Sequence, residues 1–129
     1  MQELVIKSID SSARLVFSNF EGDYFTARFL SPALSVTKRV YAYQDWKSLV
    51  NLFEYLAQKW KGWDGEKNWS SIEGEFSISC SSDKMGHVHI KLKFREVNYQ
   101  EPWVAEPSLN LEAGQLEGIS KQVRKFFLC

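Results

Sequence analysis

Apolar and polar residues alternate with a period of two along the first third of the chain. Such alternation is typical of strands that bury one face. Four stretches carry it, and they span residues 4–9, 13–18, 25–29 and 34–42. The polar turn sequence at 19–23 joins the second stretch to the third as a hairpin. Lys38 falls on the apolar side of the fourth stretch, which predicts a bulge or a sheet edge there.

A helical spacing replaces this alternation in the middle of the chain. Apolar residues recur at i, i+3, i+4 and i+7, and the stripe comprises Trp46, Leu49, Val50, Phe53, Leu56, Ala57 and Trp60. Asp45 is the expected N-cap, because its carboxylate can accept bonds from free backbone N–H groups. Gly62 is expected to end the helix. The pattern predicts one amphipathic helix that buries Trp46 and Trp60.

The period of two returns in the second half of the chain. Residues 72–80 and 88–94 alternate around the turn sequence SSDKMG, which predicts a hairpin. Gly86 is expected to adopt a positive φ, with Asp83 holding the turn through hydrogen bonds. The register we expect places Ser79 opposite His87. It pairs unlike charges across the exposed face, Glu75 with Lys91 and Glu73 with Lys93.

A further strand and a helix close the chain. Residues 103–111 alternate, with Pro107 marking an edge or a bulge, and an apolar stripe predicts a helix over 113–127. The order β-β-β-β-α-β-β-β-α indicates an α+β protein in which two amphipathic helices pack on one antiparallel sheet. A length of 129 residues suits a single domain over 1–129.

The charge balance and the absence of targeting signals limit the classes of function that this chain can have. Sixteen Lys and Arg balance sixteen Asp and Glu, so no long-range field of one sign draws the chain to nucleic acid or to an anionic membrane. The first residues lack a signal-peptide pattern, and no run of about 18 apolar residues occurs. We expect a cytoplasmic protein that binds neither nucleic acid nor membrane. Cys80 and Cys129 lack metal-ligand spacing and are expected to be free thiols.

The histidines provide the clearest candidate chemistry. His87 and His89 lie two residues apart on one predicted strand, so both imidazoles point to the same side. Spacing supplies no third or fourth ligand, and we expect no metal and no cofactor. The pairs Asp83–His87 and Glu73–Glu75 lack the convergent cleft that catalysis needs, so no catalytic residue is assigned. The alternative is a small enzyme or ligand-binding domain that uses the turn with Asp83, His87 and His89.

Two tryptophans suggest a different kind of site. Trp63 and Trp69 lie in the segment WDGEKNW, which has two turn signals and is expected to be a loop. Exposed tryptophans stack on sugars or anchor protein interfaces, and core packing explains them equally well. In a binding module they would join charged hairpin residues in one patch. The candidate binding residues are Trp63, Trp69, Glu73, Glu75, Asp83 and His87.

Several motifs resemble those of a family of small, uncharacterised bacterial proteins. The chain has GWDGEKNW, SSIEGEFSIS, Asp83, Gly86-His87-Val88 and LNLEAGQLEGIS in order. The family pattern is GW-x-G-x-x-x-W-x-S-L-E-G-E, then D-x-x-GHV and LE-x-GQL. The hairpin also resembles, over a shorter length, immunity proteins paired with a wall-associated contact toxin, although Ile72 replaces their usual Leu. This second resemblance implies a cytoplasmic binding protein that neutralises a toxin, and neither resemblance supplies a catalytic residue. We therefore expect a non-enzymatic binding module whose partner is another protein, with a toxin domain as one candidate.

Overall fold

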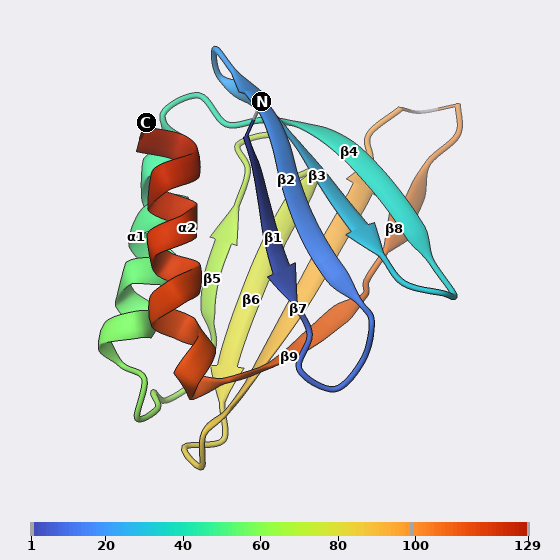
Figure 1. Ribbon diagram of the computed structural model, residues 1–129. Helices are drawn as coiled ribbons and strands as arrows, with labels where there is room; N and C mark the ends of the chain where they lie inside the picture. The colour runs from blue at the N-terminus through green and yellow to red at the C-terminus, as the bar shows by residue number, and fades with distance from the viewer. Residues whose placement is uncertain (1, 99, 129) are drawn as a thin grey trace.

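The computed structural model, which describes residues 2–98 and 100–128, contains nine strands and two α-helices. The N-terminal strands form a four-stranded antiparallel sheet in chain order, called sheet A here (Figure 1). They are β1 (Glu3–Lys7), β2 (Arg14–Glu21), β3 (Tyr24–Leu30) and β4 (Ser35–Tyr41). The predicted strands are confirmed, because each alternating stretch forms one of them.

The remaining strands form a second antiparallel sheet, sheet B. They are β5 (Lys67–Ser70), β6 (Phe76–Ser82), β7 (His87–Glu96), β8 (Trp103–Ala105) and β9 (Ser108–Glu112). β8 and β9 pair with the same edge of β7, one after the other. The strand predicted over 103–111 is therefore split at Pro107, which has no N–H to donate.

The core lies between the two sheets. The ring of Phe76 on β6 packs 5.9 Å from that of Phe17 on β2 and 6.4 Å from that of Phe25 on β3. The α+β class is confirmed, and the expectation of one sheet is wrong. Each sheet has one apolar face, and packing the two faces together buries both in a single core.

The helices fill the open side of this pair of sheets. Helix α1 (Asp45–Gln58) contacts β5, and α2 (Leu116–Leu128), which follows the short 3-10 turn η1 (Ala113–Gln115), contacts β1. Figure 1 shows both helices along the same side of the molecule. On the opposite side β4 contacts β7. Within the part of the chain that is described, no helix has the length and apolar character needed to cross a membrane.

The edge predicted at Lys38 is also confirmed. β4 is an edge strand of sheet A, and the Lys38 ammonium contacts the Glu96 carboxylate at the end of β7 at 3.1 Å. This ion pair holds the pKa of Glu96 below its usual range. A lysine can occupy the inward side of β4 because its charge meets a carboxylate of the facing sheet.

The ends of α1 differ from the prediction. Gln44, with φ 58°, is the N-cap, and Asp45 is the first helical residue rather than the cap. The helix ends at Gln58, so Trp60 lies beyond the apolar stripe and is 54% exposed. The expected burial of Trp60 is therefore wrong. Trp46 packs against the core as predicted.

The β6–β7 hairpin forms with a register that differs from the expected one. Ser79 pairs with Lys91 instead of His87, four residues further along β7. The turn is closed by a hydrogen bond of 3.2 Å from the Asp83 N–H to the His87 carbonyl, so it spans 83–87. The expected pairs of Glu73 and Glu75 with lysines are consequently absent, and serines of β6 face Lys91 and Lys93.

Cys80 is a core residue, as its place in the strand pattern indicates. It is fully buried, and burial raises the pKa of its thiol to about 12. The thiol therefore stays protonated at neutral pH and is a poor nucleophile. Cys129 lies outside the described residues.

Candidate functional site

The two tryptophans of the predicted patch are buried. Trp63 and Trp69 are each 5% exposed. The Trp63 Nε1–H donates to the Cys80 carbonyl at 3.2 Å, and the Trp69 Nε1–H donates to the Asp45 carbonyl at 2.9 Å. The expected loop is wrong around Trp69, because β5 pairs with β6 and turns this side chain into the core. Neither indole is available to a partner.

Glu75 is also buried, at 4% exposure. Its carboxylate accepts hydrogen bonds from the Ser71 hydroxyl and from the N–H of Tyr41, the latter at 3.2 Å. Tyr41 is the last residue of β4, so Glu75 ties the base of the β6–β7 hairpin to the edge of sheet A. The expected exposed position of Glu75 is wrong. Glu73, two residues earlier, is exposed in the preceding turn.

The turn of the hairpin has the predicted chemistry. Gly86 has φ 94°, and the Asp83 carboxylate accepts bonds from the backbone N–H groups of Met85 and His87 at 2.7 and 3.1 Å. Its second oxygen lies 2.6 Å from the His87 Nδ1. The bond from Met85, followed by that from His87, lowers the pKa of Asp83. The prediction for Gly86 and Asp83 is confirmed.

A chain of polar contacts surrounds the second histidine. The His89 Nδ1 lies 2.8 Å from the Asn110 Oδ1, and the Asn110 Nδ2 donates to Asp10 at 2.9 Å. The amide of Asn110, followed by the hydroxyl of Ser8, lowers the pKa of Asp10. Asp10, His89 and Asn110 line a concavity of 540 Å³, together with Asp83 and His87. We call it the histidine cleft and define it by Asp10, Asp83, His87, His89 and Asn110.

Both imidazoles of the histidine cleft are oriented through Nδ1. An Nδ1–H that donates to the Asp83 carboxylate or to the Asn110 oxygen leaves Nε2 as an acceptor. The cleft can therefore accept hydrogen bonds at both Nε2 atoms. No group of three or more His, Cys, Asp or Glu side chains among the described residues is arranged to hold a metal ion.

A group of aromatic residues that the sequence patterns did not reveal lies at the other end of the hairpin. The rings of Tyr24 and Tyr41 are 5.0 Å apart, and those of Tyr41 and Tyr43 stack at 6.4 Å with an interplanar angle of 11°. The Arg39 guanidinium lies 5.7 Å from the centre of the Tyr24 ring. It donates to the Asn19 carbonyl at 2.6 Å and to the Thr26 hydroxyl at 3.1 Å.

This group is open to solvent. Tyr24 is 45% and Tyr43 48% exposed, while Tyr41 is half-buried. Burial, followed by the charge of Asp23 and with a smaller part from Glu73, raises the pKa of Tyr41. We call this group the tyrosine surface and define it by Tyr24, Arg39, Tyr41, Tyr43 and Glu73.

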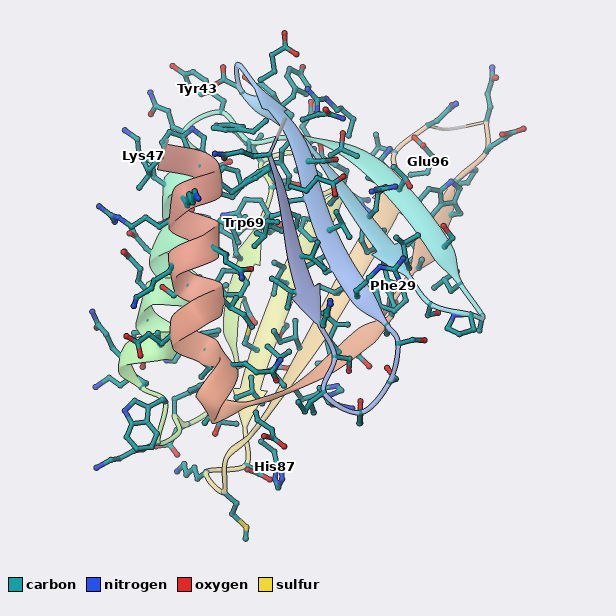
Figure 2. All side chains as sticks on the ribbon, viewed as in Figure 1. Phe29, Tyr43, Lys47, Trp69, His87 and Glu96 are labelled. Carbon is teal, nitrogen blue, oxygen red and sulfur yellow. The ribbon has the colours of Figure 1, made fainter. Side chains whose placement is uncertain are left out.

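The structure thus divides the predicted patch among three places. Trp63, Trp69 and Glu75 lie in the interior, Glu73 belongs to the tyrosine surface, and Asp83 and His87 belong to the histidine cleft. Figure 2 shows Tyr43 and His87 at opposite ends of the molecule. One signal of the tyrosine surface is present in the sequence. Tyr41 and Tyr43 are two residues apart in the motif YAY, a spacing that puts side chains on one side of an extended chain.

The fold and these two surfaces define a small α+β protein in which a helix pair closes one side of two sheets. The model of a family of unknown function, DUF6228, matches residues 6–128. The chain belongs to this family. A search of curated proteins and a search of solved structures each found no match.

Proposed function

We propose that this protein is a non-enzymatic binding module that contacts a protein partner through the tyrosine surface. The observation that carries the proposal is the exposed, mutually packed set of Tyr24, Tyr41 and Tyr43 with Arg39 beside it. Tyrosine and arginine are enriched in the centres of protein interfaces, and they dominate the measured hot spots.

The geometry reduces the entropy lost on binding. Arg39 is already held by two hydrogen bonds, to Asn19 and Thr26, and each tyrosine ring is braced by another ring. Immobilising a free, rotamer-rich side chain on binding costs about 0.5–1.5 kcal/mol. A surface whose side chains are already ordered avoids most of that loss, so its contacts contribute more of their free energy to affinity.

The class of partner is the finer part of the proposal. The resemblance of the hairpin to immunity proteins supports a toxin domain, whose activity this chain would neutralise by binding. The tyrosine surface has both charge signs, from Arg39 and Glu73, so it suits a partner of mixed charge. A toxin gene with a secretion module immediately upstream would support this class, and an operon of metabolic enzymes would argue against it.

The experiment is site-specific photocrosslinking in the source cell. Benzoylphenylalanine, close to tyrosine in shape, replaces Tyr24, Tyr43 or, as the control, His87. We expect both tyrosine positions to capture the same protein and His87 to capture none of it, with capture reduced when Arg39→Ala is added. The proposal fails if the tyrosine positions yield no common protein, or if His87 captures it equally well.

A second candidate function rests on the oriented imidazoles of the histidine cleft. With both Nδ1 atoms engaged, the two Nε2 atoms can accept bonds from the donors of a small ligand. A ligand-binding role predicts that the double variant His87→Gln, His89→Gln no longer binds the small ligand. Variants of the tyrosine surface should bind it as wild type does. The absence of a metal stays a prediction, and elemental analysis finding one zinc per purified chain would contradict it.

A further inference from the structure

Trp60 is an exposed tryptophan that belongs to neither of the two sites described above. It follows the last residue of α1 by two positions and is 54% exposed. The ammonium of Lys61 lies 5.5 Å from the centre of its ring. An indole this open leaves much of its apolar surface in water, where a ligand that covers it would gain free energy from burial.

The indole forms one wall of a concavity of 480 Å³ between the end of α1 and the start of α2. Its lining residues are Ala57, Gln58, Trp60, Ala113, Gly114 and Glu117. Lys61 is not among them, so the cation lies outside the space that adjoins the ring. The residues around that space have no side chain beyond a methyl group, apart from Gln58, Glu117 and Trp60 itself.

The composition matches that of small-molecule sites. Such sites typically enclose about 300–1,000 Å³, with mostly apolar walls and a small number of polar groups that orient the ligand. Here the polar groups are the amide of Gln58 and the carboxylate of Glu117. Both residues are exposed, and the Glu117 contact to Lys121 is an open surface pair at 3.4 Å. Both can therefore turn toward a ligand.

We infer that this concavity binds the ring of a saccharide. One face of a pyranose presents C–H groups, which pack flat on an indole, and its rim presents hydroxyl groups. The Glu117 carboxylate accepts bonds from such hydroxyls, and the Gln58 amide can both donate and accept. A phosphate-bearing ring is disfavoured by the charge of Glu117. We call the concavity the Trp60 pocket.

Gly114 allows a test that leaves the fold intact. A Cβ added there would meet no atom within 4 Å, and its φ lies outside the left-handed region. Because Gly114 lines the pocket, we expect the larger side chain of Gly114→Leu to occupy part of it. Gly118→Leu is the matched control, because a Cβ there also meets nothing within 4 Å, yet Gly118 does not line the pocket.

The measurement is the shift of the Trp60 indole N–H signal in a proton–nitrogen correlation spectrum, assigned by its absence in Trp60→Phe. The probes are glucose, galactose and N-acetylglucosamine, with tetramethylammonium as a cation probe. We expect at least one sugar to shift the Trp60 signal and to leave the other indole N–H signals unchanged. The dissociation constant should be about 1–10 mM, because the ligand is small. Gly114→Leu should weaken binding by about tenfold or more, whereas Gly118→Leu should bind as wild type.

Three results would overturn the inference. The first is that none of the probes shifts the Trp60 signal, and the second is that only tetramethylammonium shifts it. The third is that Gly114→Leu binds the sugar as tightly as wild type. Glu117→Gln separates charge from shape, since it keeps a hydrogen-bonding group of the same length. We expect it to weaken sugar binding by only a few-fold, because the amide oxygen still accepts a bond from a hydroxyl group, although a weaker one than the carboxylate accepts. Failure here leaves the role of the tyrosine surface untouched, because no residue is shared.

Discussion

The β6–β7 hairpin connects two ends of the molecule that expose different groups, hydrogen-bonded polar side chains at its turn and tyrosine rings at its base. At its turn, Asp83 accepts three hydrogen bonds and Asp10, across the cleft, accepts two. At its base, the Glu75 carboxylate accepts hydrogen bonds inside the fold, from the Ser71 hydroxyl and from the Tyr41 N–H at the end of β4. The neighbouring tyrosine rings remain exposed.

The difference shows where binding free energy is available. At the histidine cleft the carboxylates and the Asn110 amide are already bonded within the chain, so a partner gains mainly bonds to the two histidine Nε2 atoms. Each hydrogen bond exchanged with water contributes only about 0.5–1.5 kcal/mol net. A partner at the tyrosine surface covers apolar rings that now face water, which contributes about 25 cal/mol per Å² buried. For this reason the base of the hairpin is the stronger candidate interface.

The largest effect is expected in the interior that supports the base. The ring of Trp69 packs 6.2 Å from that of Phe76, the first residue of β6. Trp69→Ala should lower the free energy of unfolding by about 3–5 kcal/mol, as other large-to-small core substitutions do. Trp60→Ala, which removes an exposed indole, should change it by less than about 1 kcal/mol. Equal losses in urea denaturation would contradict the assignment of Trp69 to the core and Trp60 to the surface.

A smaller loss is expected from the buried carboxylate at the base. Glu75→Ala leaves the N–H of Tyr41 without its acceptor, and an unsatisfied buried donor costs about 1–3 kcal/mol. The control is Glu73→Ala, two residues away and exposed, which should stay within about 0.5 kcal/mol of wild type. The same denaturation series measures both. If the two variants lose stability equally, Glu75 does not join the hairpin to sheet A.

At the turn, Gly86 is the sensitive position. Its φ of 94° is one that residues with a Cβ rarely adopt, so Gly86→Ala should destabilise the protein by about 1 kcal/mol. Gly114→Ala is the control, because φ there lies outside the left-handed region, and it should be neutral or stabilising. Thermal melts of both variants measure the difference. A neutral Gly86→Ala would mean that the turn relaxes at no cost.

The smallest effect is a pH dependence at the turn. The pKa of Asp83 lies below its ordinary value of 3.8 in the folded state. The contribution of its carboxylate is therefore fully present above that value and is lost as pH falls through the lower, folded pKa. Asp83→Asn should be less stable than wild type at neutral pH, and the two should converge as pH falls below 3.8. A stability difference that is constant with pH would show that the charge plays no part.

Local patterns predicted most of the elements, and they predicted the roles of Asp83 and Gly86 in the hairpin turn correctly. Alternation located the strands because each strand buries one face, and the link between Asp83 and Gly86 is contained within a few residues. The register of the hairpin was wrong because the bond from the Asp83 N–H to His87, and not the charges of the strands, sets the turn.

Long-range pairing explains what the patterns missed. The burial of Trp69 requires β5 to pair with β6, and WDGEKNW by itself has only turn signals. The tyrosine surface requires the register that sets Tyr24 opposite Tyr41. Glu75, 34 positions from Tyr41 in the chain, then holds the end of β4. None of these contacts has a local signature.

The most direct test compares the two ends against one partner. The protein captured by the crosslinkers at Tyr24 and Tyr43 is purified. Calorimetry then measures its affinity for two double variants, one with Tyr24→Ala and Tyr43→Ala, the other with His87→Ala and His89→Ala. Our account predicts that the tyrosine pair loses about 2 kcal/mol or more of binding free energy, the scale of an interface hot spot. It predicts that the histidine pair stays within about 0.5 kcal/mol of wild type. Unchanged affinity in the tyrosine pair, or a larger loss in the histidine pair, would contradict it.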